Sequence, residues 1–341
     1  MLRAVDANLN RACEGLRVLE DLARFALDDG GLTSELKSLR HRLAATSIPI
    51  ARGLLNARRA GEDVGAETPE AGRRDLLALL NANARRVQES LRALEELAKL
   101  PDAAPSLQPP EFKRARFQAY SWQCTLADLL LRKEKRERVR GLYAIVDPEC
   151  CGDRSAVEVA EAALRGGAHL VQLRDKRRDK GLVLPDASAL FRLCESHGAL
   201  FIVNDDVDLA LVSGADGVHL GQSDLPAALA RRLMPLGAVV GVSVNNAQEA
   251  RTAEQDGADY VAVGAIFPTD TKANTRPSGP NSVRQVREAV ALPVVAIGGI
   301  KVENAASVVA AGADAVSVIS ALCGAEDVEA AARALVAAME A

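Results

Sequence analysis

The first part of the chain carries the hydrophobic pattern of helices. Apolar residues recur at steps of three and four along four segments, which predicts helices over residues 3–28, 32–59, 70–99 and 110–138. Turn-forming stretches such as DDGG and the proline-rich LPDAAPSLQPP separate these segments. The pattern therefore predicts an all-α helical domain over residues 1–138.

Residues 139–341 follow a different pattern. Short β-branched segments alternate with alanine-rich helical segments, and the strand candidates are GLYAIVD, HLVQLRDK, LFIVNDD, GVHLGQ, AVVGVSV, YVAVGAIF, PVVAIGGI and DAVSVIS. Such alternation indicates a parallel sheet covered by helices, and this many strands favour closure over an open sheet. We therefore predict an α/β fold, a (β/α)8 TIM barrel preceded by the helical domain.

One helical segment occurs twice, as DANLNRACEGLRVLEDLARF at 6–25 and NANARRVQESLRALEELAKL at 81–100. Burial of an apolar stripe requires only size and apolarity, yet the two copies also share Asn, Arg and Glu residues. One interpretation is a solvated face with ion pairs inside each helix. The other is a pseudo-twofold domain that brings paired polar residues to a shared site, for which the candidates are Asn8, Arg11, Arg17, Glu20, Asn83, Arg86, Arg92 and Glu95.

Composition narrows the classes of protein. Hydrophobic residues make up 48% of the chain but aromatic residues only 3%, so the core must be aliphatic. The net charge of −4 gives no reason to expect a nucleic-acid partner. The sequence has neither an apolar signal-peptide core nor a run long enough to span a membrane, so no membrane partner is expected. The six cysteines lack C-x-x-C and zinc spacings, which favours reduced thiols in a cytoplasmic protein.

The working residues of such a barrel are expected where its strands end. Arg174 and Lys176 follow the second strand candidate, Asp205 the third and Asp224 the fourth. Two carboxylates with open coordination positions suit Mg²⁺, while Lys and Arg offset phosphate charge. His219 lies within a strand, where we expect a hydrogen-bonded interior residue. The rim therefore predicts a site for phosphorylated small molecules, in which a departing pyrophosphate is stabilised.

The motifs QLRDK, VNDDVDLAL, GADGVHLGQSDLP, GVSV, VGAIFPTDTK, AIGGI and VSVIS, in this order, resemble the thiamine phosphate synthase family over residues 141–341. The resemblance implies that 4-amino-2-methyl-5-(diphosphooxymethyl)pyrimidine is joined to a thiazole phosphate, carboxylated or not, with release of pyrophosphate. It also implies a dissociative mechanism, in which the thiazole nitrogen captures a pyrimidinylmethyl cation. A thiazole tautomerase-like relative, which would lack part of the diphosphate and metal residues, is the alternative.

The same resemblance implies a role for each matching residue. The catalytic residues would be Arg174, Lys176, Ser243 and Lys272. The pyrimidine diphosphate would be bound by Gln172, Leu173, Arg174, Asp175, Lys176, Asn204, Ser243 and Lys272. The thiazole phosphate would be bound by Thr269, Asp270, Thr271, Gly299, Ile319 and Ser320. Mg²⁺ would be held by Asp205 and Asp224, although Ser223 stands where the family often has a second acidic residue.

The N-terminal half resembles a helical module that is fused ahead of some thiamine phosphate synthases. The resemblance rests on VDANLNRACEGLRVLEDLARF, LLNARRAGEDVGAE, NANARRVQESLRALEELAK and FKRARFQAYSW. It implies hydroxymethylpyrimidine phosphate kinase activity with ATP as co-substrate. LLNARRAGEDVG departs from the module's pattern, and the sequence contains no G-x-x-x-x-G-K-[ST] loop, so arginines would bind the phosphates. A structural or dimerisation arm, which would produce a homo-oligomer, is the alternative.

Overall fold

The computed structural model describes residues 1–58, 72–269 and 277–340. The chain forms two compact units, Met1–Leu131 and Arg132–Ala341, which we name the helical unit and the barrel unit. The division falls inside helix α5 (Pro109–Glu137). A domain boundary at residue 138, where the sequence pattern changes, stays a prediction.

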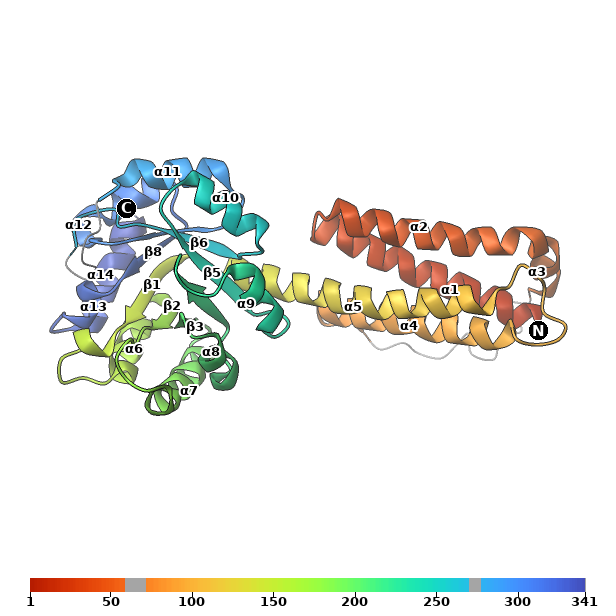
Figure 1. Ribbon diagram of the computed structural model, residues 1–341, viewed down its shortest axis with the longest axis horizontal. Helices are drawn as coiled ribbons and strands as arrows, with labels where there is room; N and C mark the ends of the chain where they lie inside the picture. Colours follow the sequence, from red (N-terminus) through yellow and green to blue (C-terminus); the bar gives the residue numbers. More distant parts are fainter. Residues whose placement is uncertain (59–71, 270–276, 341) are drawn as a thin grey trace. The chain divides into compact units, whose positions relative to one another are not determined.

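Helices make up the helical unit, and Figure 1 labels them in chain order. They are α1 (Leu2–Asp21), α2 (Gly30–Ser47), α3 (Ala51–Ala57), α4 (Leu76–Leu97) and the first part of α5, with a π-helical turn η1 (Leu22–Ala26) and a 3₁₀ turn η2 (Ile48–Ile50). The prediction of one helix over 32–59 is wrong, because the chain passes through the turn η2 at Pro49, which has no backbone N–H to donate to an α-helical hydrogen bond. The helix predicted from residue 70 begins only at Leu76, where the Asp75 carboxylate accepts the backbone N–H of Ala78 at 2.6 Å.

The core of the helical unit is the predicted apolar stripe. Leu9, Ala12, Leu16, Leu19 and Ala23 of the first segment and Ala84, Val87, Leu91, Leu94 and Ala98 of the second are all buried in one cluster. Helices α1 and α4 run antiparallel beside each other (Figure 1). They approach closely at Gly15, where an added Cβ would lie 2.7 Å from Val87 Cγ2 and 3.1 Å from the carbonyl oxygen of Asn83.

The repeat covers a pair of helices rather than one. Arg40 of α2 donates to the buried Glu20 at 2.9 Å, and Arg116 of α5 donates to the buried Glu95 at the same distance. Buried residues recur at the same spacing around the two arginines: Leu36, Leu39 and Leu43 in α2, and Phe112, Ala115 and Ala119 in α5. The helical unit is therefore pseudo-twofold, with α1 and α2 equivalent to α4 and α5.

Within the described residues, eight parallel strands close into a barrel in sequence order, as the alternating pattern predicted. The strands are β1 (Gly141–Val146), β2 (Ala168–Leu173), β3 (Leu200–Asn204), β4 (Gly217–Leu220), β5 (Val239–Val244), β6 (Tyr260–Val263), β7 (Val294–Ile297) and β8 (Ala315–Val318). The helices around them are α6 (Ala156–Arg165), α7 (Lys180–Ser196), α8 (Val207–Ser213), α9 (Ala227–Leu233), α10 (Ala247–Gln255), α11 (Pro280–Ala289), α12 (Val302–Ala310), α13 (Ser320–Cys323) and α14 (Val328–Glu340). This is the predicted (β/α)8 fold.

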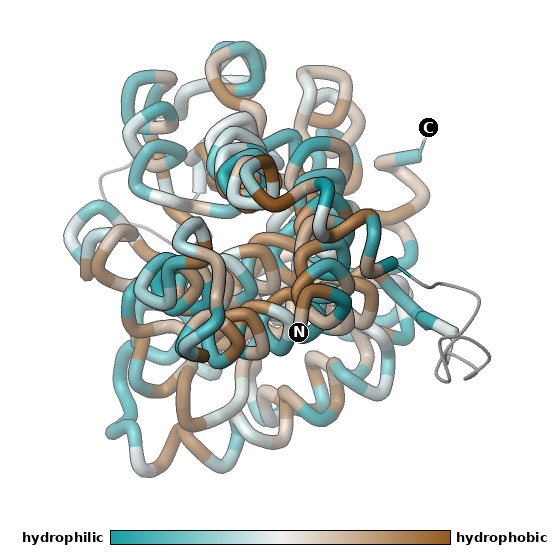
Figure 2. Tube along the Cα trace, turned by 90° about the vertical axis from the view of Figure 1, so that its right-hand side faces the viewer, coloured by the Kyte–Doolittle hydropathy of each residue, from teal (hydrophilic) through white to brown (hydrophobic). Residues whose placement is uncertain are grey.

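Alternate strand residues divide the barrel unit into two cores. In β1, Leu142 and Ala144 pack outward among the helices, while Tyr143 packs inside the barrel with Leu170 and Tyr260. Hydrophilic and hydrophobic residues alternate along the trace in Figure 2, as expected of amphipathic elements. Among the described helices, none combines the length and apolarity that a membrane span requires.

Candidate active site

A cavity of about 570 Å³ opens at the C-terminal ends of the barrel strands. The predicted site residues that line it are Arg174, Lys176, Asn204, Asp205, Asp224, Ser243, Thr269, Gly299, Ile319 and Ser320. These residues come from loops and strand ends far apart in the sequence, and closure of the barrel brings them to one mouth.

Three predicted residues have other contacts in this structure. Gln172 is buried and donates its side-chain amide to Tyr143 Oη at 2.7 Å. Leu173 packs in the outer core, and the Asp175 carboxylate pairs with Arg178. Their roles in binding the pyrimidine diphosphate stay predictions. The predicted residues Asp270, Thr271 and Lys272 lie outside the described residues.

Acidic partners hold both cationic side chains at the cavity. Arg174 Nη1 pairs with Asp147 Oδ2, and the Asp147 side chain is buried directly after β1. Lys176 Nζ lies 3.1 Å from Asp205 Oδ2. A buried carboxylate that fixes a guanidinium reduces the number of rotamers the arginine can adopt before a ligand arrives. The Arg174 guanidinium is therefore held in place at the cavity.

The carboxylates of Asp205 and Asp224 lie close together. Burial, together with the neighbouring Asp224 carboxylate, raises the pKa of Asp205. Asp224 Oδ2 also accepts the backbone N–H of Gly221 at 2.7 Å. The described residues contain no cluster of three or more His, Cys, Asp or Glu side chains arranged for a metal. Two mutually repelling carboxylates nevertheless fit Mg²⁺, since this ion keeps waters and takes further ligands from substrate phosphate.

A buried hydrogen-bond chain supports Ser243. Ser243 Oγ lies 2.9 Å from His219 Nε2, and His219 Nδ1 lies 3.1 Å from Tyr260 Oη. Tyr260 Oη lies 3.0 Å from Tyr143 Oη, inside the barrel. Burial raises the pKa of both tyrosines, so both remain hydroxyl groups. The prediction that His219 is a hydrogen-bonded interior residue is confirmed, and the chain of contacts fixes the Ser243 hydroxyl at the cavity.

Glycines form the cavity wall after β7. Gly298 and Gly299 have φ angles of +99° and +66°, and a Cβ at Gly299 would lie 2.4 Å from the carbonyl oxygen of Pro268. Only glycine fits there, which leaves the backbone N–H groups unobstructed. Ile319 and Ser320 follow β8 beside this turn, and the loops after the last two strands are where barrels of this type commonly bind phosphate.

A second cavity, of about 490 Å³, lies between α1 and α4 in the helical unit. We name it the α1–α4 groove, and it is lined by Asn8, Arg11, Glu14, Ala82, Arg85, Arg86, Glu89 and Ser90. Three of the candidates from the repeat, Asn8, Arg11 and Arg86, therefore face one cavity. Asn83 does not line the groove and donates its side-chain amide to the Leu79 carbonyl oxygen at 2.9 Å.

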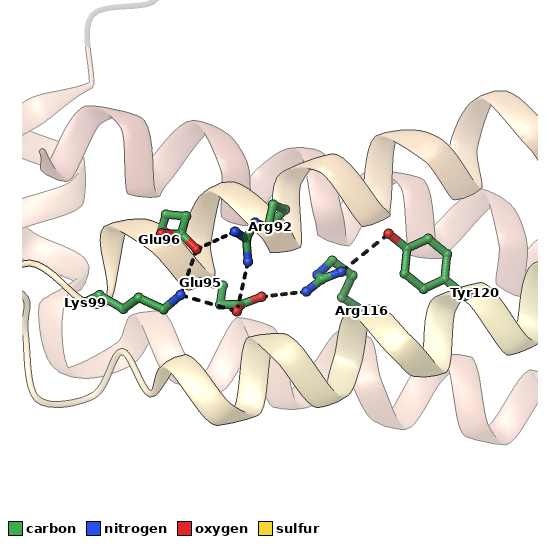
Figure 3. A network of polar contacts seen from close by, with 6 residues as sticks. All are labelled: Arg92, Glu95, Glu96, Lys99, Arg116 and Tyr120. Atoms are coloured by element: carbon green, nitrogen blue, oxygen red, sulfur yellow. Dashed lines mark hydrogen bonds and ion pairs between the residues drawn. The ribbon is translucent and has the colours of Figure 1, made fainter.

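The other candidates from the repeat form ion pairs, some inside one helix and some between neighbouring helices. Figure 3 shows the Glu95 carboxylate between Arg92 of its own helix and Arg116 of α5, at 3.1 and 2.9 Å. The hydrogen bond from Arg116 holds the pKa of Glu95 below its usual value. Arg17 and Glu20 repeat the first of these contacts, at 3.1 Å. The ion-pair interpretation thus fits Arg17, Glu20, Arg92 and Glu95, and a role for them in binding stays a prediction.

Comparison with known proteins shows which family this chain resembles. The profile of the family described as thiamine monophosphate synthase matches residues 142–322. The thiamine-phosphate synthase of Thermosynechococcus vestitus is 42% identical over 338 residues, which cover 98% of this chain and 93% of that protein. The chain belongs to the thiamine-phosphate synthase family. The thiamine-phosphate synthase of Gloeobacter violaceus is also 42% identical, over 96% of this chain and 93% of that protein.

Two further matches concern the separate parts of the chain. The structure of the thiamine phosphate pyrophosphorylase from Pyrococcus furiosus covers 60% of this chain and 98% of its own, with 39% identity and a TM-score of 0.56. The ThiD2 family profile matches residues 3–125. The resemblances carried by the sequence motifs are confirmed, and the chain is a transferase of the thiamine-phosphate synthase family with a ThiD2-like N-terminal region.

Several residues in the cavity or in contact with its lining have no counterpart among the predicted ones. Asp147 ends the strand motif GLYAIVD, and its position directly after β1 was the available signal. Gln222 donates to the Ser243 carbonyl oxygen at 2.6 Å and follows β4 in the motif GVHLGQ. Ser317 of β8 lines the cavity, and its buried hydroxyl has no partner within the described residues. Nothing in the sequence distinguishes Ser317 from an ordinary strand residue.

Proposed function

We propose that the barrel unit condenses 4-amino-2-methyl-5-(diphosphooxymethyl)pyrimidine with a thiazole phosphate to give thiamine phosphate and pyrophosphate. The observation that carries this proposal is the cavity in which Arg174 and Lys176 lie with Asp205 and Asp224. Family membership supports the same reaction. A tautomerase-like activity has less support, because the diphosphate and metal residues that it would lack line this cavity.

Arg174 and Lys176 would bind the diphosphate and stabilise the charge that develops as it leaves. Arg174 is oriented by Asp147, so its guanidinium needs little reorganisation when the substrate binds. Ser243 would bind the pyrimidine part of this substrate through a hydroxyl that His219 holds in place. The glycine turn after β7, with Ile319 and Ser320, would bind the thiazole phosphate beside it. Two anions would therefore occupy opposite sides of one mouth.

The proposed step is dissociative. The bond between the pyrimidine methylene carbon and the diphosphate oxygen breaks, and pyrophosphate keeps the electron pair. The thiazole nitrogen then donates its lone pair to the methylene carbon, forming the new C–N bond. This ring nitrogen carries no proton, so the step needs no general base. The residues around the cavity have only to orient both substrates, exclude water and stabilise the leaving group.

Asp205 and Asp224 would hold Mg²⁺, whose charge would offset that of the diphosphate when the ion is bound. The two carboxylates meet at one point of the cavity, which supports this assignment. The cysteines are free in the structure, which supports a reducing, cytoplasmic location for the reaction.

The test is pyrophosphate release by the full chain supplied with both substrates and Mg²⁺. We expect Asp205→Ala to lower kcat at least 100-fold, since one of the two carboxylates is lost. Asp256→Ala is the matched control, because Asp256 is exposed at the end of α10, away from the strand C-termini. Failure of the wild-type chain to release pyrophosphate, or release that Asp205→Ala leaves unchanged, would refute the proposal.

We also propose a second activity for the helical unit, phosphorylation of hydroxymethylpyrimidine phosphate by ATP. The ThiD2 match over residues 3–125 and the arginine-lined groove support it. A phosphate oxygen of the substrate would attack the γ-phosphorus of ATP, and the bond between that phosphorus and the β,γ-bridging oxygen would break. ADP would leave with the electron pair, and the product would be the diphosphate that the barrel consumes. A structural arm remains the alternative.

A coupled assay distinguishes these two alternatives for the helical unit. The full chain is supplied with hydroxymethylpyrimidine phosphate, ATP, Mg²⁺ and thiazole phosphate, and both ADP and thiamine phosphate are measured. A kinase would form ADP and thiamine phosphate in equal amounts. A structural arm would give neither product from this mixture, although the same chain would still make thiamine phosphate from the ready-made diphosphate.

A further inference from the structure

The α1–α4 groove lies where the two halves of the helical unit meet. Arg11 and Glu14 line it from α1, and the equivalent residues of the repeat, Arg86 and Glu89, line it from α4. Because the two helices run antiparallel, each contributes its copy of the pair from the opposite direction (Figure 1). One cavity therefore contains both copies of the same Arg and Glu.

The contacts of the fold do not account for Arg11 and Glu14. The other shared charged residues take part in ion pairs: Arg17 and Arg92 pair with Glu20 and Glu95 inside their own helices, and the two glutamates also pair with arginines of neighbouring helices. In contrast, neither Arg11 nor Glu14 forms a hydrogen bond or ion pair through its side chain in residues 1–58, 72–269 and 277–340, and both are exposed. Exposed helix positions tolerate many residues, so the recurrence of Arg and Glu at the equivalent positions 86 and 89, which line the same groove, indicates a role in binding.

Small residues keep the groove open. Ala82 and Ser90 line it from α4, and Ser90 is buried. The position equivalent to Ser90 in the first copy is Gly15, where α1 and α4 approach closely. Short side chains at the crossing leave room above it for a ligand, and the volume of about 490 Å³ is within the range of small-molecule sites.

The charges of the groove indicate the class of ligand. Arg11, Arg85 and Arg86 supply three cations, and Glu14 and Glu89 supply two anions. Guanidinium groups bind phosphate oxygens in a bidentate manner, whereas carboxylates repel a bare phosphate. A polyphosphate that carries Mg²⁺ satisfies both sets of side chains, because the ion can contact carboxylate and phosphate oxygens together.

We infer that the α1–α4 groove binds the polyphosphate of a nucleoside triphosphate with its Mg²⁺, the arginines contacting phosphate and Glu14 and Glu89 facing the ion. This inference rests on the kinase activity proposed for the helical unit and places its nucleotide site. The groove provides two copies of each type of contact, one from each half of the repeat.

The experiment measures ATP binding by the full chain with calorimetry, in the presence of Mg²⁺ and without a phosphate acceptor. Arg11→Ala and Arg86→Ala should each weaken the affinity about 10- to 100-fold, the usual effect of losing a charge-assisted hydrogen bond. Arg11→Lys should weaken it less, since it retains the charge but not the planar fork. Chelation of Mg²⁺ by EDTA should also weaken binding.

Arg114→Ala is the matched control, because Arg114 is an exposed arginine of α5 whose ion pair is with Glu111 of the same helix. It should bind ATP like the wild type. Pyrophosphate release by the barrel from ready-made substrates, together with Trp122 fluorescence, verifies that each variant is folded. An affinity that Arg11→Ala and Arg86→Ala leave unchanged, or binding that EDTA strengthens, overturns the inference.

The outcomes for the groove and for the kinase can be told apart. If the chain forms ADP in the coupled assay and the groove variants do so equally well, the kinase stands and the groove assignment is wrong. If the chain forms no ADP but Arg11→Ala and Arg86→Ala still abolish ATP binding, the groove assignment stands and the kinase is wrong. Loss of hydroxymethylpyrimidine phosphate binding alone, with ATP binding intact, also overturns the nucleotide assignment.

Discussion

Gly15 sets the distance between α1 and α4, and replacing it with alanine should destabilise the helical unit. An added Cβ would lie 2.7 Å from Val87 Cγ2 and 3.1 Å from the carbonyl oxygen of Asn83. The first contact is with a β-branched side chain that has few alternative rotamers, and the second is with backbone. Neither atom can move without separating the helices.

Two opposing effects determine the size of the change. Alanine in place of glycine inside a helix gains about 1 kcal/mol from backbone propensity. Overpacking of a close interface costs about 1–3 kcal/mol. The free energy of unfolding of the helical unit should therefore fall by roughly 1 kcal/mol, which corresponds to a melting temperature lower by about 3–5 °C. Gly30→Ala is the control, because no atom lies within 4 Å of a Cβ at that position.

Trp122 makes the measurement specific. It is the single tryptophan of the chain, is buried in the helical unit and donates its indole N–H to Glu35 Oε2 at 2.9 Å. Its fluorescence during urea unfolding therefore follows this unit alone. In a Val87→Ala background the same Gly15→Ala change should become stabilising, because the shorter contact has been removed. Equal effects of Gly15→Ala in the two backgrounds would refute the steric explanation.

Three further experiments test other parts of the structure. Tyr260→Phe should lower the free energy of unfolding by about 1–3 kcal/mol, since Tyr143 and His219 each lose a hydrogen-bond partner. The substitution should also lower kcat, because Ser243 is then less firmly held by His219. An unchanged kcat would contradict this reasoning. The hydrogen bond from Arg116 lowers the pKa of Glu95, so the stabilising effect of this ion pair is present above about pH 4.3 and is lost as the pH falls. When unfolding is followed by tryptophan fluorescence, the stability of Glu95→Gln should therefore decline less steeply with acid than that of the wild type. Identical acid titration curves for the two proteins would contradict this. Burial raises the pKa of Cys194 to about 12. Mass spectrometry should therefore find no labelling of this thiol by iodoacetamide at pH 8 until the chain unfolds. Rapid labelling of Cys194 in the folded chain would contradict this prediction.

The barrel could be predicted from the sequence because its strands are short, β-branched and regularly spaced, and helices separate them. The helical unit was predicted less completely. The repeat of α1 in α4 is visible as many identical letters, whereas α2 and α5 share only Glu35/Glu111, Lys37/Lys113 and Arg40/Arg116. Leucines in α2 correspond to Phe112, Ala115 and Ala119 in α5. These three identities are too few to establish a repeat from the sequence, so the second half of the repeat is recognised from the shared spacing of buried positions and from the equivalent ion pairs of Arg40 and Arg116.

The candidate site likewise contains residues that could be predicted from the sequence and residues that could not. Residues in the loops after the strands, such as Lys176 and Asp224, could be placed at the mouth because strand order determines which ends meet. Asp147 could not be assigned a role, since its importance comes from its ion pair with Arg174, which follows the neighbouring strand. Gln172, expected at the substrate, is buried inside the barrel, where its side-chain amide donates to Tyr143 Oη; this contact joins two strands and cannot be read from the motif.

Arg132 determines where this chain can be cut. It lies in α5, upstream of the point where the hydrophobicity pattern changes. Its guanidinium nevertheless lies 2.7 Å from the buried Asp259 carboxylate, which also pairs with Arg231. A barrel fragment that began at Val139 would leave that carboxylate with one cation fewer in a site closed to water. The place at which this barrel could be exchanged for another during gene fusion therefore lies inside a continuous helix, before residue 132, and not at the visible change in sequence.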